Sequence, residues 1–245
     1  MNWNHWDKPR VADKSLLFAD GSSNRVEIAD AASISNLTTV TVLMIILKPS
    51  PVTGGRRIWV KGLDTAVHDK TLRFNGTSGA IQWSISRATT AANVITSTLL
   101  KLDVWQVLAG TYSEANGPKI FFGGLTSPMF EAAYGTGPVV GSGATGNDSD
   151  TPIYIANRQT LNISPAVKVG FMAYFAAELT LSDIEKCRAA LAQGQRIPVP
   201  FCVVNMPLGK TIGPPLDISG YNNHGVVTGA TLNEGLTLSR LKRTA

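Results

Sequence analysis

The chain has 245 residues, of which 44% are hydrophobic and 16% are charged. This balance excludes disorder over most of the length and predicts one domain with a sizeable core. The formal net charge is only +5, and the basic residues are scattered except for Arg240, Lys242 and Arg243 near the end, so we expect no nucleic-acid partner.

The first residues, MNWNHWD, lack the basic segment and the apolar stretch of a secretory signal peptide. No apolar run is long enough to span a bilayer, so we expect no export signal and no membrane insertion. The two cysteines, Cys187 and Cys202, form neither a disulfide framework nor a zinc-ligand spacing. We expect reduced, buried thiols, with a bridge between them as the alternative.

Residues 1–14 form a polar N-terminal arm, and strands are predicted after it. Residues 24–28 alternate, which places Val26 and Ile28 on one face of a half-buried strand. Residues 39–47 are apolar on both faces, as in a central strand that is covered on both sides. Three short strands then form a meander separated by glycine-containing turns, over residues 58–60, 72–74 and 81–85.

The second half contains a predicted hairpin, two further strands and a helix, over residues 105–124, 153–155, 167–175 and 182–193. Ser182 is the expected N-cap with Glu185 as its partner, and Ile184, Cys187 and Leu191 share one face. Residues 135–146 contain five glycines, which predict a mobile loop. A phosphate-binding loop is not supported, because no Gly-Lys-Ser/Thr follows.

Three segments resemble the LamG-like branch of the concanavalin A-like lectin/glucanase superfamily. They are the turn from Asp217 to Gly225, the hairpin over residues 105–124, and the strand and helix from Val167 to Glu185. The resemblance covers residues 15–232 and implies an all-β, concanavalin A-like jelly-roll β-sandwich with one short helix, followed by a tail over residues 233–245. Gly123 stands where the family usually has an aspartate.

The order of these motifs differs from that of the family. Residues 201–232 resemble its opening strand and turn, moved to the other end of the chain. We therefore predict a circular permutation, since the termini of a sandwich often lie close together. A truncated second copy is the competing explanation.

The chain lacks the patterns of hydrolytic catalysis. No Glu-x-Asp-x-Glu triplet and no Gly-x-Ser-x-Gly elbow occur. The three histidines, His5, His68 and His224, are scattered and provide no zinc-ligand set. We therefore predict a protein that is not an enzyme and has no metal or cofactor, with a divergent glycoside hydrolase as the third alternative.

A sugar site usually combines an exposed aromatic ring with polar groups. We assign Trp59, Trp83 and Trp105 to the core, so the tyrosines near predicted loops are the better candidates. The predicted ligand-binding residues are Tyr134, Asn147, Asp148, Asp150 and Tyr154. Oxygen atoms of Asn147, Asp148 and Asp150 suit calcium, whereas a solvated turn explains the same residues more simply.

The leading hypothesis is a non-catalytic surface or structural component of a phage or similar particle, such as a decoration protein or tail adhesin. It would be assembled in the host cytoplasm and lie on the virion surface. Its partners would be protein neighbours in a symmetric assembly, contacted through the two ends at Trp3, Trp6, Leu236, Leu238 and Leu241. The alternative is a lectin-like module that binds a glycan on the loops from Tyr134 to Asp150, with calcium as a possible aid.

Overall fold

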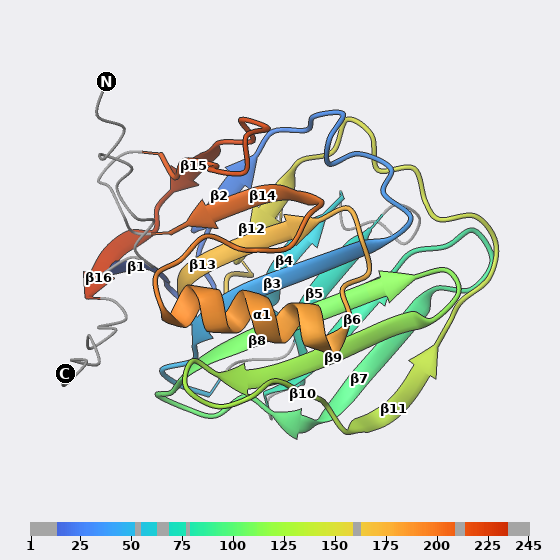
Figure 1. Cartoon of the computed structure of the whole chain (residues 1–245), viewed down its shortest axis with the longest axis horizontal. Helices are drawn as coiled ribbons and strands as arrows, with labels where there is room; N and C mark the ends of the chain where they lie inside the picture. Colours follow the sequence, from blue (N-terminus) through green and yellow to red (C-terminus); the bar gives the residue numbers. More distant parts are fainter. Residues whose placement is uncertain are drawn as a thin grey trace.

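The computed structural model describes residues 14–51, 55–62, 69–76, 79–158, 163–208 and 214–234. These residues build two antiparallel β-sheets packed face to face, with one helix outside them (Figure 1). The predicted all-β sandwich with a single short helix is confirmed. No helix in the described ranges is long and apolar enough to cross a lipid bilayer.

Sheet A has eight strands. In spatial order they are β10 (Phe130–Glu131), β9 (Gly117–Gly124), β8 (Trp105–Ser113), β3 (Val40–Leu47), β13 (Val167–Phe175), β1 (Lys14–Phe18) and β16 (Thr231–Glu234), and β14 (Cys202–Pro207) also pairs with β13. The predicted hairpin is confirmed as β8 and β9, and the predicted central strand is β3.

Sheet B also has eight strands. Their order is β11 (Tyr134–Val139), β7 (Ala92–Leu99), β6 (Ala80–Ile85), β5 (Lys70–Asn75), β4 (Arg57–Lys61), β12 (Ile153–Ile155), β2 (Arg25–Ile28) and β15 (Gly225–Thr228). The predicted meander corresponds to β4, β5 and β6, which pair in chain order.

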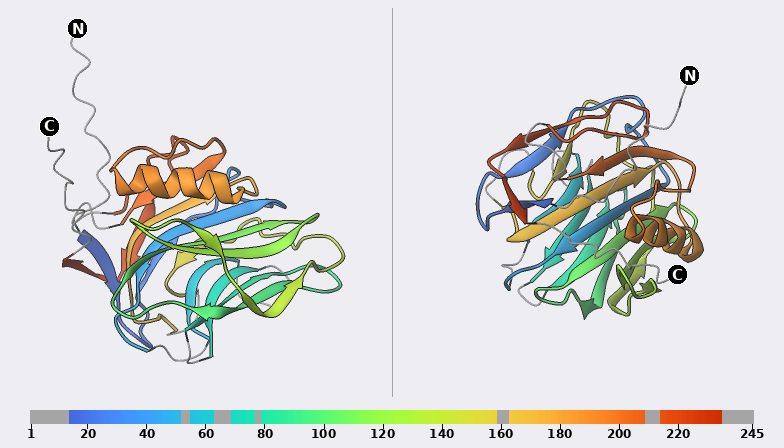
Figure 2. Two further views of the ribbon diagram at one scale, coloured as in Figure 1. Left: turned by 60° about the horizontal axis from the view of Figure 1, so that its bottom comes forward. Right: turned by 60° about the vertical axis from the view of Figure 1, so that its left-hand side comes forward.

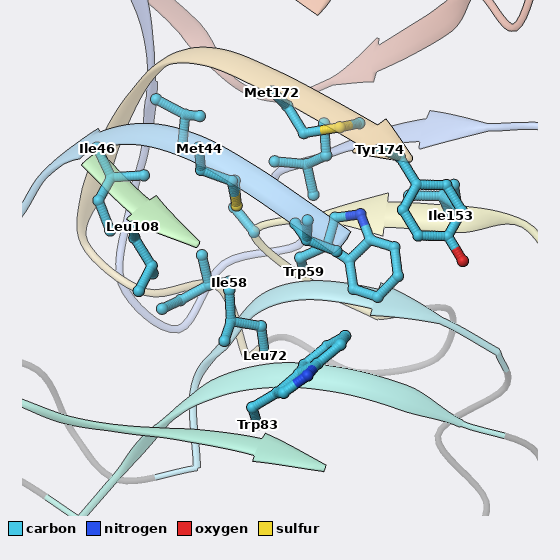
Figure 3. Close-up of a cluster of buried hydrophobic side chains, with 14 of the residues drawn as sticks. Met44, Ile46, Ile58, Trp59, Leu72, Trp83, Leu108, Ile153, Met172 and Tyr174 are labelled. Carbon is cyan, nitrogen blue, oxygen red and sulfur yellow. The ribbon is translucent and has the colours of Figure 1, made fainter. Parts of the chain in front are cut away.

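The main core lies between the two sheets. Trp59 of β4 packs between Trp83 of β6 and Tyr174 of β13, with ring centroids 5.8 Å and 5.2 Å away (Figure 3). Trp59 and Trp83 are both 0% exposed, as predicted, and the indole nitrogen of Trp83 donates to the carbonyl of Thr111 at 2.9 Å. Trp105, which we had also assigned to the core, is only partly buried and packs beside the layer under the helix.

The helix α1 (Leu181–Ala192) covers the outer face of sheet A (Figure 2). Its buried residues Ile184, Cys187 and Leu191 pack on Leu43 and Ile45, which point outward from β3. The opposite face of β3 contributes to the main core. This double coverage explains why β3 is apolar on both faces.

The N-cap of α1 differs from the prediction. Thr180, rather than Ser182, is the cap: its hydroxyl oxygen accepts from the backbone N–H of Asp183 at 3.2 Å. The hydroxyl also donates to the Asp183 carboxylate at 2.7 Å. Glu185 instead pairs with Arg188 and accepts from the backbone N–H of Met129. The helix therefore begins earlier because Thr180 and Asp183 satisfy its first free N–H groups.

The C-terminal segments belong to both sheets. β14 pairs with residues 171–175 of β13, and β1 pairs with residues 167–169 along the same edge. β16 then pairs with β1, and β15 pairs with β2. Strand pairing therefore continues across residue 232, the predicted end of the sandwich, and the strands nearest the two ends of the described chain are neighbours.

The carboxylate of Asp217 organises the turn before β15. Its Oδ1 accepts from the backbone N–H groups of Asn205 and Ser219, at 2.8 Å and 2.9 Å. Its Oδ2 accepts from the Ser219 hydroxyl at 2.7 Å and from the Asn223 N–H at 3.0 Å. The side chain is 6% exposed. This buried carboxylate therefore joins the turn to β14.

The two glycines of this turn have different roles. Gly220 has φ of +101°, a left-handed conformation that glycine adopts more readily than other residues. Gly225 does not have a positive φ, but a Cβ there would lie 2.7 Å from Cγ1 of Val26. Glycine is needed at 225 because β15 lies close to β2.

The glycine-rich stretch is not the mobile loop that we predicted. Its first part is the strand β11, which pairs with β7. In the loop that follows, the Arg87 guanidinium donates to the carbonyl of Gly143 through Nε at 2.8 Å and through Nη2 at 2.5 Å. Strand pairing and this arginine therefore fix the segment.

Replacing Asp217 with Ala should lower the free energy of unfolding by about 3 kcal/mol, because several donors lose an ionised acceptor together. Urea unfolding followed by fluorescence measures this change. Ser219→Ala, which removes one hydroxyl from the same turn, should cost about 1 kcal/mol. Equal effects of the two substitutions would show that Asp217 does not organise the turn.

Cys187 and Cys202 are both free thiols, as predicted, and burial raises the pKa of each to about 12. A thiol reagent at about pH 8 should therefore modify the native protein far more slowly than the protein in guanidinium chloride, because thiolate is the reactive form. Absorbance of the released thiol product measures the two rates. Native thiols that react as fast as those of the unfolded chain would contradict this prediction.

Candidate functional site

The two predicted ligand-binding tyrosines do not offer free rings. Tyr154 is 1% exposed, and the Arg25 guanidinium carbon lies 5.6 Å from its ring centroid. Tyr134 is half-buried, and its hydroxyl donates to Glu131 at 2.7 Å and accepts from the N–H of Ile120 at 3.2 Å. Among the tyrosines of the described chain, the exposed one is Tyr221, at 55%.

The other predicted ligand residues share the loop between β11 and β12 but do not act together. Asn147 is exposed, and its side-chain oxygen accepts from the N–H and hydroxyl of Ser149. Asp150 is also exposed, and its backbone N–H donates to Asp30 at 2.9 Å. Asp148 is fully buried, so a solvated turn is the wrong description of this residue.

Asp148 belongs to a buried ionic network at one end of the sandwich. Its Oδ2 accepts from the ammonium of Lys70, and its Oδ1 accepts from the backbone N–H of Asn36 at 2.5 Å. Lys70 lies directly opposite Lys61 on the neighbouring strand, and the two side chains are 2% and 0% exposed. A second hydrogen bond joins the same two residues, since the side-chain oxygen of Asn36 accepts from the Asp148 N–H at 3.0 Å.

The ammonium of Lys61 has three oxygen partners. It donates to a carboxylate oxygen of Asp30 and to the carbonyls of Asp148, at 3.1 Å, and Thr151. These contacts tie the loop between β2 and β3 and the loop between β11 and β12 to the sheet. The three N–H groups of the buried ammonium are therefore satisfied, as a buried charge requires.

These oxygens do not fit a calcium ion. Asp30 and Asp148 each already contact an ammonium, and the ammonium of Lys61 lies where the oxygens converge. Within the described ranges, no three His, Cys, Asp or Glu residues are grouped to hold a metal ion. We therefore assign the network to the stability of this end of the sandwich.

A second group of polar side chains lies on the outer face of sheet B. Leu72 and Trp83 point into the main core, so the alternating residues Arg73 and Gln82 point outward. Arg73 Nε donates to Gln82 Oε1 at 2.8 Å, and Gln82 Nε2 donates to Asn93 Oδ1 at 2.8 Å. Arg57 lies directly opposite Arg73 on β4. We call these four residues the polar row; they lie on the adjacent strands β4, β5, β6 and β7.

The polar row is rigid and positively charged. Arg57 is 8% and Gln82 is 7% exposed, whereas Arg73 and Asn93 are half-buried. Burial lowers the pKa of Arg57, and burial together with the Arg57 charge lowers the pKa of Arg73. The same two causes lower the pKa of Arg158, beyond the end of β12. The charge of Arg57 therefore acts on both Arg73 and Arg158.

The polar row is not among the site residues predicted from the sequence, although part of its signal is visible in the sequence. The alternation in residues 72–74 and 81–85 places Arg73 and Gln82 on polar faces of predicted strands. β7 was not predicted, however, so Asn93 had no position. The pairing that brings Arg57 opposite Arg73 depends on a bulge in β4 between Arg57 and Trp59.

The remaining predicted site residues lie outside the described residues. They are the assembly contacts Trp3, Trp6, Leu236, Leu238 and Leu241. Exposed apolar side chains do occur near the Asp217 turn: Leu216, Ile218, Tyr221 and Val226 are between 44% and 63% exposed.

Replacing Lys70 with Met should lower the free energy of unfolding by about 4 kcal/mol, because Asp148 then keeps a buried charge without its ammonium. The double variant Lys70→Met/Asp148→Leu should recover a large part of this loss. Chemical denaturation of both variants provides the comparison, with and without EDTA. A double variant less stable than Lys70→Met, or a loss of wild-type stability in EDTA, would contradict our assignment of the network.

No protein-family model and no curated protein matches the chain. Solved structures do match. A putative carbohydrate-binding protein from Bacteroides ovatus aligns over 90% of this chain with a TM-score of 0.61 and 14% identity. This chain spans 59% of the length of that protein.

A heptameric SAP-like pentraxin from Limulus polyphemus aligns over 94% of this chain and 98% of its own, with a TM-score of 0.56 and 11% identity. The LG1–3 region of the laminin α2 chain aligns over 70% of this chain and 33% of its own, with a TM-score of 0.50 and 12% identity. At these identities the similarity establishes the fold. The chain therefore has a concanavalin A-like, LamG-like jelly-roll fold, as its three sequence motifs indicated.

Proposed function

We propose that the chain is a non-catalytic, lectin-like module that binds a glycan on the outer face of sheet B. The observation that carries this proposal is a series of two side-chain hydrogen bonds, from Arg73 to Gln82 and from Gln82 to Asn93. Sugar hydroxyls both donate and accept hydrogen bonds, and an arginine with two amides supplies both kinds of group. Because these side chains stand on paired strands and orient one another, the site is organised before a ligand binds.

The position of the polar row also supports this proposal. α1 covers the outer face of sheet A, whereas in the described part of the chain no helix covers the outer face of sheet B (Figure 2). The structurally similar Bacteroides ovatus protein is described as a putative carbohydrate-binding protein. That description is consistent with a glycan ligand here.

Several carboxylates of the described chain have structural partners, which favours a binding role over hydrolysis. Glu27 pairs with Arg25, Glu131 accepts from Tyr134, and Glu114 accepts from Thr145. Asp183 accepts from the hydroxyl of the N-cap residue Thr180, and Glu185 accepts from the backbone N–H of Met129. Glycoside hydrolysis needs one carboxylic acid and one carboxylate that face the same bond, and these side chains have structural partners instead.

A role on a virion surface remains a prediction, because it depends on partners and on the two ends of the chain. A divergent glycoside hydrolase also remains an alternative. Release of reducing sugar by the purified protein from any bound polysaccharide would favour that alternative over a binding module.

A glycan array with the purified wild-type chain, followed by calorimetry on the strongest ligand, tests the proposal. Asn93→Ala should weaken binding by about tenfold, because Gln82 then loses the acceptor that fixes its amide. Asn147→Ala is the matched control, since it removes the same amide from the loop between β11 and β12. Weaker binding by Asn147→Ala alone would place the ligand on that loop and overturn the site proposed here.

A further inference from the structure

We infer that the ligand of the polar row is an acidic glycan whose carboxylate or sulfate group is bound by Arg73 beside Arg57. This inference rests on the proposed function and specifies its ligand class. It follows from the arrangement of the two arginines, the hydrogen bonds of Arg73 and the other groups on the same face.

The two arginines occupy directly opposite positions on neighbouring strands and point to the same face. Like charges in such cross-strand pairs destabilise a sheet. The effect is strengthened here because Arg57 is 8% exposed and Arg73 is half-buried, where water screens their charges less than on an open surface. An anion bound between them would turn this repulsion into attraction.

The hydrogen bonds of Arg73 leave its terminal nitrogens available for such an anion. Nε is held by Gln82, whose amide is in turn oriented by Asn93. Within the described chain, neither Nη1 nor Nη2 of Arg73 donates to a protein acceptor, and no carboxylate forms an ion pair with this arginine. A guanidinium whose Nε is held by Gln82 and whose two terminal nitrogens have no acceptor in the described chain matches a planar carboxylate or a sulfate in a two-point contact.

The other acidic groups near this face have different roles. Glu27 forms an ion pair with Arg25 at 3.3 Å. Asp69 is 8% exposed, and burial is the main reason that its pKa is raised to about 7, although Arg57 opposes this rise. Arg57 is attracted by Asp69 and Arg25 pairs with Glu27, so Arg73 is the guanidinium that we assign to the acidic group of the ligand.

The neutral groups around Arg73 favour a glycan over a nucleic acid. Thr71 and Ser84 are opposite each other on β5 and β6 and alternate onto the same outer face, beside the amides of Gln82 and Asn93. Hydroxyl and amide groups can bind the ring hydroxyls that surround an acidic substituent.

Calorimetry with two pairs of probes tests the inference. The pairs are oligogalacturonate with its fully methyl-esterified form, and dextran sulfate with dextran. We expect at least one acidic probe to bind about tenfold or more tightly than its neutral counterpart. The carboxylate pair and the sulfate pair then identify which acidic group is preferred.

Two variants that each remove one positive charge separate a specific contact from the overall charge. Arg73→Gln should lose about tenfold or more in affinity for the acidic probe and should keep its affinity for a neutral one. Lys186→Gln, on the exposed side of α1, should leave both affinities unchanged. Without ligand, Arg73→Gln should unfold at a temperature equal to or above that of wild type, because the repulsion from Arg57 is removed.

The possible failures can be distinguished. Neutral glycans that bind through Asn93, with no preference for the acidic forms, would overturn this inference and leave the proposed function in place. An absence of glycan binding across the array and both probe pairs would overturn both. Equal loss of binding in Arg73→Gln and Lys186→Gln would show that only the overall charge acts, which would overturn the inference. An RNA oligonucleotide that binds more tightly than the acidic glycans would overturn it as well.

Discussion

Strands β3 and β13 have to bury both of their faces, and the rest of the structure depends on this constraint. One face of β3 packs on sheet B through Val42 and Met44, and the other packs under α1 through Leu43 and Ile45. Each apolar side chain removed from water contributes roughly 25 cal/mol for every Å² that is buried. Two covering layers, a second sheet and a helix, are therefore needed on opposite sides of sheet A.

Sheet B is subject to a weaker constraint, because its central strands bury apolar residues mainly on the inner face. The alternating positions on β5 and β6 are free to carry polar groups, and Arg73 and Gln82 use them. The candidate site is consequently built on the frame of the sandwich rather than on its loops. Such a site gains precision, since paired strands limit the movement of the side chains they carry.

The chain uses its buried charges in two different ways. At one end of the sandwich, Lys61 and Lys70 are paired with carboxylates and carbonyls, and they fix two long loops without a metal ion. On the outer face of sheet B, Arg57 and Arg73 face each other with the same sign. The first arrangement pairs each ammonium with oxygens of the protein, whereas for the second we propose that Arg73 binds an anionic group of the ligand.

The sequence determined the features that depend on local pattern, namely the alternating strands, the β8–β9 hairpin, the buried face of α1, the burial of Trp59 and Trp83, and the turn at Asp217. It missed several strands, among them β7, β10, β11 and β16, where polar residues and glycines obscure the period of two, and it wrongly placed the N-cap of α1 at Ser182. The tertiary structure alone decided the polar row and the network around Asp148, because their members come from strands and loops far apart in the chain. A register shift of one residue would move Arg73 to the opposite face, so strand pairing, rather than residue type, decides which groups meet.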